Sequence, residues 1–272
     1  MSWKLAKRAD LLGYDIAYDV LGSGPPVVLV HGFPSNSFIW RNIAPRLAKT
    51  RTVHVYDLPG QGQSGKRPGL DVSDPAQARV LKALLAHWGL KRPAMVLHDI
   101  GNTYGLFANY FEGCTYERLA LVSAACMNPC VTAATLHAQA HLEAYRTMPY
   151  PLYELIASAR IRSTTFKPIS KQAFKAYLAP WRGAEGQAAW YNRVAQIDPK
   201  HIGKLESKLA PMNIPVLIAW GADDTWIPAD QAERLKGYIS NAEIRLIPKA
   251  GHFPQEDAPE EVAEILARFL AA

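Results

Sequence analysis

Residues 94–101 read Ala-Met-Val-Leu-His-Asp-Ile-Gly, an apolar run that stops at an aspartate and a glycine. The first four residues predict a short buried strand. Gly101 and Gly105 stand at the start of a predicted helix. A sharp turn from strand to helix lifts one side chain above a sheet, which is the geometry of a nucleophile elbow. The side chain lifted here is the carboxylate of Asp99, and a carboxylate nucleophile attacks saturated carbon and forms an ester of itself.

The strands and helices predicted around this elbow alternate along the chain, which indicates an α/β fold with a mostly parallel sheet. The wholly apolar runs are typical of central parallel strands. The predicted strands are residues 15–21, 26–30, 52–56, 95–97, 119–122, 216–219 and 243–247, and the predicted helices are residues 75–90, 101–111 and 260–270.

The alternation stops between about residues 127 and 211, where the composition is helical, prolines recur and no buried strand is predicted. We interpret residues 1–127 and 212–272 as an α/β core. Residues 128–211 are predicted to form an inserted helical cap subdomain, called the cap below. A chain of 272 residues is long enough for one large domain with such an insertion.

Composition limits the expected location and binding partners of the protein. No run of 18 apolar residues predicts a membrane span, and residues 1–8 do not resemble a secretory signal. Cys114, Cys126 and Cys130 form an odd set without a CxxC pair, so we expect no disulfide framework and a cytoplasmic location. The net charge of +6 is spread along the chain, which argues against nucleic-acid binding. The predicted partner is a small organic substrate, and the predicted state is a monomer or homodimer.

Four motifs follow predicted strands, at the carboxyl ends where open α/β sheets place their active sites. In residues 31–34, His-Gly-Phe-Pro, the backbone N–H of Phe33 is a candidate oxyanion-hole donor. The elbow supplies Asp99 as nucleophile and the N–H of Ile100 as a second donor. Residues 220–228 contain two acids, and residues 250–254 contain a histidine beside a glycine.

The last two motifs complete a catalytic triad. Asp224, three residues after Gly221, is favoured over Asp223 as the acid that orients His252, the predicted general base. The order Asp99, Asp224, His252 is the nucleophile–acid–histidine order of the α/β-hydrolase fold. Each motif alone has an ordinary structural alternative, such as a helix N-cap for Asp99 or an Asx turn for the acid.

Taken together, these segments resemble the α/β-hydrolases of the epoxide hydrolase and haloalkane dehalogenase group. The resemblance rests on residues 31–34, 57–64, 98–101 and 251–252 and covers about residues 10–127 and 212–270. It implies an ester intermediate on Asp99, hydrolysed by a water that His252 activates, with no metal or organic cofactor. It also implies that Gly60–Gly65, which fits a GxGxxG pattern, is a structural turn rather than a dinucleotide site.

The resemblance also ranks the substrates. Haloalkane dehalogenases hold the halide with side-chain N–H donors beside the nucleophile, and Ile100 and Phe33 have none. Epoxide hydrolases place cap tyrosines over the epoxide oxygen. Residues 190–193, Trp-Tyr-Asn-Arg, resemble a segment that bears one of these, so Tyr191 is the candidate donor. The second donor is left open among Tyr150, Tyr153, His137 and His141.

An epoxide hydrolase is therefore the leading hypothesis, and a haloalkane or haloacid dehalogenase is the second, with Trp181 and Trp190 as an alternative halide site in the cap. An ester or lactone hydrolase and a non-catalytic binding protein on the same scaffold are further alternatives. His31, His98 and Trp190 are expected to line the pocket. One departure from the family is Leu97, two residues before the nucleophile, where small residues are common.

Overall fold

A computed structural model describes residues 3–271. Met1 and Ser2, the first residues of the segment for which no secretory signal was predicted, lie outside this range, as does Ala272. None of the helices within residues 3–271 is long and apolar enough to cross a lipid bilayer.

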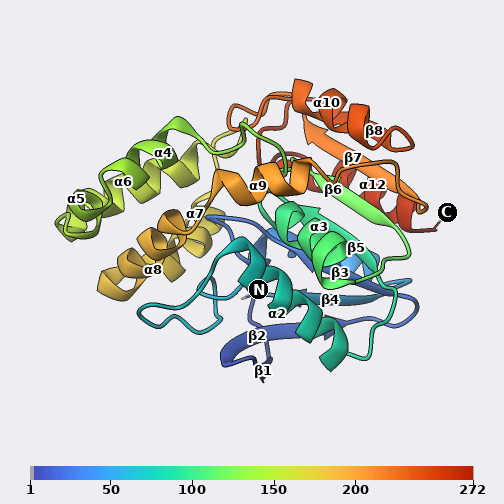
Figure 1. Cartoon of the computed structure of the whole chain (residues 1–272), viewed down its shortest axis with the longest axis horizontal. Helices are drawn as coiled ribbons and strands as arrows, with labels where there is room; N and C mark the ends of the chain where they lie inside the picture. The colour runs from blue at the N-terminus through green and yellow to red at the C-terminus, as the bar shows by residue number, and fades with distance from the viewer. Residues whose placement is uncertain (1–2, 272) are drawn as a thin grey trace.

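The core of the molecule is one eight-stranded sheet in the order β1-β2-β4-β3-β5-β6-β7-β8 (Figure 1). β1 and β2 pair antiparallel with each other, β2 pairs antiparallel with β4, and all other pairs are parallel. The predicted α/β class with a mostly parallel sheet is therefore confirmed. The strands are β1 (Lys7–Leu11), β2 (Tyr14–Leu21), β3 (Pro26–Val30), β4 (Thr52–Tyr56), β5 (Ala94–His98), β6 (Leu119–Val122), β7 (Val216–Gly221) and β8 (Glu243–Ile247).

Strand β1 was not predicted from the sequence. Its residues, Lys-Arg-Ala-Asp-Leu, show neither an apolar run nor a regular alternation, and only Ala9 is buried. The strand lies at the edge of the sheet, where it is paired on one side only. Charged side chains are common on edge strands because they discourage pairing with other chains, and they also hide the strand from a hydrophobicity pattern.

Helices cover both faces of the sheet. In Figure 1, α2 and α3 lie together on the near face, while α12 lies behind the sheet. Helix α2 packs on α3, and α12 packs on α1. The helices of the core are α1 (Ala44–Leu47), α2 (Asp74–His87), α3 (Gly101–Glu112), α10 (Asp230–Tyr238), α11 (Pro254–Asp257) and α12 (Pro259–Ala271), with a short 3-10 helix η1 (Ser37–Trp40).

Between β6 and β7 the described chain forms only helices. Helices α4, α5, α6 and α8 gather beyond the strand ends at one end of the sheet, whereas α9 packs on α3 of the core (Figure 1). The helices of this insertion are α4 (Ala133–Ala140), α5 (Leu142–Arg146), α6 (Tyr150–Arg162), α7 (Lys171–Leu178), α8 (Gly183–Ala195) and α9 (Pro199–Glu206), with a 3-10 helix η2 (Ala179–Trp181).

Helix α8 is joined to the core by a buried ion pair. Arg193 Nη2 donates to Asp74 Oδ1 at 2.9 Å, and both side chains are almost completely excluded from solvent. Arg193 Nη1 also donates to the carbonyl of Val72 at 2.7 Å, and the N–H of Val72 donates to Gln196 Oε1 at 2.8 Å. Breaking a buried pair leaves an uncompensated charge, so this contact fixes the position of α8 over the core.

The bulky Leu97 is accommodated by a glycine on the following helix. A Cβ atom at Gly105 would lie 2.3 Å from Leu97 Cδ1. The large side chain of Leu97, two residues before Asp99, therefore fits because Gly105 on α3 has no side chain. Helix α3 and strand β5 can then pack closely.

Candidate active site

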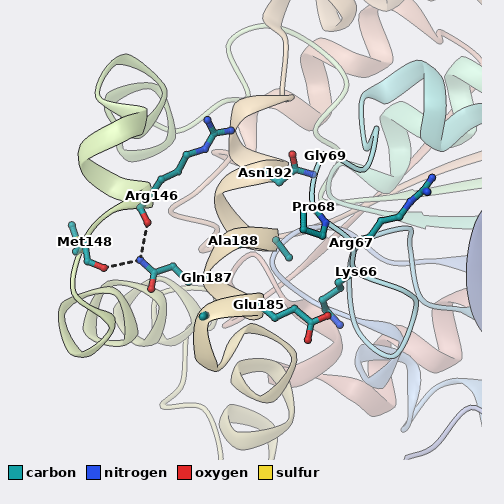
Figure 2. Close-up of a pocket in the computed structure, with 12 residues that line it drawn as sticks. Lys66, Arg67, Pro68, Gly69, Arg146, Met148, Glu185, Gln187, Ala188 and Asn192 are labelled. Atoms are coloured by element: carbon teal, nitrogen blue, oxygen red, sulfur yellow. Dashed lines mark hydrogen bonds between the residues drawn. The ribbon is translucent and has the colours of Figure 1, made fainter.

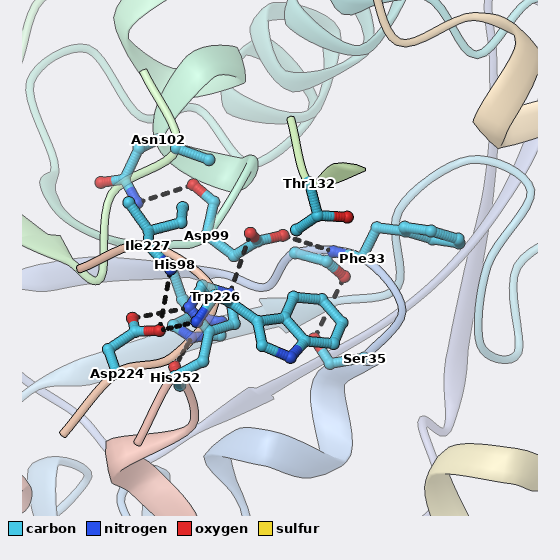
Figure 3. Close-up of polar contacts among 12 residues, drawn as sticks. Phe33, Ser35, His98, Asp99, Asn102, Thr132, Asp224, Trp226, Ile227 and His252 are labelled. Carbon is cyan, nitrogen blue, oxygen red and sulfur yellow. Dashed lines mark hydrogen bonds and ion pairs between the residues drawn. The ribbon is translucent and has the colours of Figure 1, made fainter. Parts of the chain in front are cut away.

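The carboxyl ends of four parallel strands bring the predicted site residues together (Figure 3). Phe33 follows β3, Asp99 follows β5, Asp224 follows β7 and His252 follows β8. The connection after β3 runs to β4 on one side, whereas the connection after the neighbouring β5 runs to β6 on the other side. Ligands of open α/β sheets bind beside such a switch point.

Asp99 occupies a strained backbone conformation at the predicted elbow. Its φ angle is 51°, in the left-handed region that costs energy for residues other than glycine. Four contacts hold it there. Its N–H donates to the carbonyl of Val122 at 3.2 Å, and its own carbonyl accepts from the N–H groups of Ala125 and Asn102, both at 3.1 Å, and from Asn102 Nδ2 at 2.9 Å. Asn102 is buried and was not identified from the sequence.

The carboxylate of Asp99 already contacts the first predicted oxyanion donor. The N–H of Phe33 donates to Asp99 Oδ2 at 2.8 Å, and the N–H of Ile100 contributes to lowering the carboxyl pKa of Asp99. Gly32 permits this approach, because a Cβ atom there would lie 2.3 Å from Asp99 Oδ2. An ester formed on the other oxygen would keep its carbonyl oxygen at these donors, where negative charge develops during hydrolysis.

His252 lies between two carboxylates. Its Nδ1 faces Asp224 Oδ2 at 2.9 Å, and its Nε2 faces Asp99 Oδ1 at 3.1 Å. Asp224 is oriented by the N–H groups of Trp226 and Ile227, which donate to its Oδ1 at 2.8 and 3.0 Å. The neighbouring Asp223 is exposed, so the structure brings Asp224 rather than Asp223 to the histidine.

The charges of this triad shift both pKa values away from their ordinary range. Burial opposes protonation of His252, but Asp224 and then Asp99 outweigh it and raise the histidine pKa to about 10. Burial also acts against ionised Asp99, yet its hydrogen bond and charge interaction with His252 lower the carboxyl pKa. The resting site therefore favours the protonated form of His252.

His31 and His98 have structural roles and line neither cavity beside Asp99. His31 Nδ1 donates to the carbonyl of Gly32 at 2.8 Å, and its Nε2 accepts from the N–H of Leu58 at 3.0 Å. His98 Nε2 donates to the carbonyl of His252 at 2.9 Å, and burial lowers the His98 pKa to about 4. His98 thus positions the loop of His252 as a neutral ring.

Two small adjoining cavities lie beside Asp99 and under the inserted helices. The first, of about 40 Å³, is lined by Asp99 and by Trp226, whose ring stacks on His252 with centroids 5.2 Å apart. The second, of about 60 Å³, extends under the cap and is lined by Trp190 and Tyr191. The two cavities share the lining residues Phe33, Thr135 and Arg160.

The candidate cap donors differ in what their hydroxyl groups contact. Tyr191 has a buried hydroxyl without a hydrogen-bond partner among residues 3–271. Tyr153, by contrast, donates its hydroxyl to the carbonyl of Trp181 at 2.9 Å, and neither it nor Tyr150 lines the two cavities. His137 and His141 are exposed. Tyr145, which the sequence did not single out, lines the second cavity with its ring centroid 5.5 Å from that of Tyr191.

A larger cavity of about 510 Å³ lies away from the triad (Figure 2). Residues 66–69 line it on one side. Helix α8 lines it as well, together with Arg146 and Met148 near the end of α5. None of the triad residues lines it, so the chemistry predicted from Asp99 belongs to the two smaller cavities.

The chain belongs to the alpha/beta hydrolase family, whose pattern it matches over residues 27–265. This confirms the α/β-hydrolase fold and the family expected from the sequence. The assignment as a hydrolase follows at the level of the family.

Three relatives illustrate the range within this family. A crystal structure of an alpha/beta hydrolase fold protein from Burkholderia ambifaria is 39% identical, with a TM-score of 0.93 over 97% of each chain. A soluble epoxide hydrolase from Corynebacterium sp. is 27% identical, covering 97% of this chain and 96% of the relative. The structure of a haloalkane dehalogenase from Agrobacterium tumefaciens is similar in fold, with 22% identity and a TM-score of 0.80 over 97% of this chain and 96% of the other.

Proposed function

We propose that the protein hydrolyses small epoxides to vicinal diols through an ester on Asp99. The observation that carries this proposal is the position of one carboxylate between two sets of contacts: Phe33 N–H holds Oδ2, and His252 Nε2 faces Oδ1. A carboxylate presented in this way has one oxygen for attack and one for the oxyanion hole. The similarity to a soluble epoxide hydrolase supports the same chemistry.

In the first step Asp99 attacks a ring carbon of the epoxide. A carbon–oxygen bond forms to the carboxylate, the ring carbon–oxygen bond breaks, and its electron pair stays on the departing oxygen. Tyr191 donates a proton to that oxygen, since its hydroxyl is buried, unpaired within residues 3–271 and lines the adjoining cavity. The product is a hydroxyalkyl ester of Asp99.

In the second step water attacks the ester carbonyl. Alkylation removes the negative charge of Asp99, one of the two charges that raise the His252 pKa, so the imidazolium loses a proton more easily. That proton returns to the phenolate that the first step leaves at Tyr191, and neutral His252 becomes a base. His252 takes a proton from the water, and the oxyanion is stabilised by Phe33 and Ile100. Collapse breaks the bond between the acyl carbon and the alkyl oxygen. One proton of the water stays on His252 and restores the imidazolium, and the other goes to the alkoxide oxygen of the departing diol.

The hydrogen bonds that indole N–H groups already make favour an epoxide over a haloalkane as the substrate. The indole N–H of Trp181 donates to the carbonyl of Pro34 at 2.9 Å, and that of Trp226 donates to Ser163 Oγ at 3.1 Å. Neither is therefore free to hold a halide without breaking an existing contact, so of the predicted pair Trp181 and Trp190 only Trp190, which lines the second cavity, is left as a candidate. A dehalogenase is the second candidate, because the Asp99 ester would form equally well by loss of a halide, and the fold is shared with a haloalkane dehalogenase.

A single turnover in water enriched in heavy oxygen tests the Asp99 ester. The water oxygen adds to the carboxyl carbon of the ester, so we expect one heavy oxygen in the peptide that contains Asp99 and none in the diol formed in that turnover. Mass spectrometry of the digested protein and of the product measures both. Label in the diol and not in the peptide would show direct attack of water and would refute the proposed intermediate.

Replacing Tyr191 by Phe should slow epoxide opening by about 100-fold, the usual contribution of a positioned proton donor. Displacement of a halide needs no such proton, so chloride release from a small chloroalkane should change little. The rates of Asp99 ester formation measure both effects. Tyr150→Phe is the matched control, because Tyr150 lines neither cavity. Equal rates for Tyr191→Phe and wild-type protein would remove Tyr191 from the mechanism.

A further inference from the structure

One cationic side chain of the cap reaches the cavity of the nucleophile. Arg160, on α6, lines both small cavities and is the only Lys or Arg among their lining residues. Its Nη2 donates to Thr132 Oγ1 at 3.1 Å, and its guanidinium carbon lies 3.9 Å from the centroid of the Trp226 ring. The side chain is thus oriented by the same tryptophan that stacks on His252.

The charge of Arg160 has no dedicated partner. Among residues 3–271, no side-chain carboxylate lies within ion-pair distance of it. Burial lowers its pKa from the ordinary value, while the charge of Asp99 acts in the opposite direction. Arginine nevertheless stays charged in proteins, so a partly buried guanidinium faces the cavity without a counterion of its own.

We infer that Arg160 binds a carboxylate of the substrate, so that the electrophilic carbon beside that carboxylate is presented to Asp99. The substrate class is therefore a small carboxylic acid with an adjacent epoxide or halide. This inference rests on the proposed function of Asp99 and names its substrate class.

The surrounding groups fit a carboxylate. A guanidinium matches the two oxygens of a carboxylate in geometry as well as charge. The hydroxyl oxygens of Thr132 and Thr135 lie 3.0 Å apart, and their mutual hydrogen bond uses only one of their two protons. The second hydroxyl proton can donate to the ligand. Both threonines line the cavity of Asp99 together with Arg160.

A cation is also needed on electrostatic grounds. An anionic substrate approaches an ionised nucleophile, and two like charges a few ångströms apart repel strongly in a buried site. The imidazolium of His252 is already shared between Asp99 and Asp224. Arg160 supplies a further positive charge on the cap side of the cavity, opposite the core triad.

Two pairs of compounds test this specificity: glycidate with glycidamide, and chloroacetate with chloroacetamide. The members of each pair have almost the same shape and differ in charge. The rate at which Asp99 is alkylated is followed by mass spectrometry in His252→Gln protein, in which hydrolysis of the ester is blocked. We expect Arg160→Gln to slow alkylation by the acids about 10- to 100-fold, as for loss of a charge-assisted hydrogen bond, and to leave the amides within about two-fold.

Two further variants separate charge recognition from a structural effect. Arg160→Lys keeps the charge and should recover part of the rate with the acids. Arg162→Gln is the matched control: Arg162 lies on the same helix, its guanidinium lies 3.8 Å from the centroid of the Phe174 ring, and it lines neither small cavity. Equal effects of Arg160→Gln on acids and amides would overturn the inference while leaving the Asp99 ester intact.

Absence of any adduct from all four compounds would instead contradict the proposed function. Saturation-transfer NMR on wild-type protein then tests separately whether Arg160 binds a carboxylate. The ligands are propanoate and propanamide, which cannot react with Asp99. Binding of propanoate that is lost in Arg160→Gln, with no binding of propanamide, would support the anion site without the ester chemistry. If propanoate does not bind, or binds equally to wild-type and Arg160→Gln protein, the inference that Arg160 binds a carboxylate is overturned.

Discussion

His252→Gln protein should accumulate the ester of Asp99 and lose steady-state turnover by about 10²- to 10⁴-fold, the range that general-base catalysis contributes. The first step needs only the carboxylate, its backbone donors and a proton donor in the cap. The second step needs a base, and glutamine cannot accept a proton. Intact-protein mass spectrometry should therefore show an increase equal to the mass of the opened epoxide, located on the peptide that contains Asp99.

The matched control is His137→Gln, because His137 is an exposed cap histidine away from the triad. That variant should turn over at the wild-type rate and show no adduct after substrate is exhausted. If His252→Gln loses turnover but never gains mass with epoxides, haloalkanes or haloacids, then water is attacking the substrate directly. If the wild-type protein shows no turnover either, the protein only binds these compounds.

Asp99→Asn should abolish both the adduct and turnover, with a loss on the order of 10⁴-fold or more, as found when a nucleophile is removed. Asparagine preserves the shape of the side chain and tolerates the left-handed backbone at position 99. The loss should therefore come from chemistry, and circular dichroism should show a folded protein. Residual alkylation at another residue would contradict the assignment of Asp99.

The same substitution should lower the pKa of His252, because one of the two carboxylates that raise it to about 10 disappears. A pKa raised on folding contributes stability that is complete below the unfolded value near 6.5 and is lost as the pH rises towards the folded value. Wild-type melting temperature should therefore fall between about pH 7 and 10, and that fall should be shallower in Asp99→Asn. Parallel profiles would mean that Asp99 does not act on the histidine.

The sequence was informative wherever one short segment carries its own geometry. The elbow at Asp99, the turn at Phe33, the acid loop at Asp224 and the loop of His252 each combine a buried strand with a glycine-containing turn. Parallel strands place their carboxyl ends at one edge, so the meeting of the four segments followed from their order. Edge strand β1 was not predicted, because the apolar pattern is weak where one side of a strand faces solvent.

The cap was less predictable, because its site residues depend on how separate helices pack. Tyr153 and Tyr191 are both buried tyrosines, and only the packed structure distinguishes a hydroxyl bonded to Trp181 from one without a partner. Arg160 has no motif around it in the sequence. Its importance arises from contacts with Thr132 and Trp226, which are 28 and 66 residues away along the chain.

The buried pair between Arg193 and Asp74 has a consequence for which molecules fit. Arg193 lies two residues after Tyr191 on the same helix, so the dry ion pair that fixes one also fixes the height of the other above the sheet. Moving α8 away from the core would separate the charges of Arg193 and Asp74 and leave both buried without water. We therefore expect the spacing between the Tyr191 hydroxyl and Asp99 to stay fixed when a molecule enters, and this fixed spacing to limit the length of the molecules that fit.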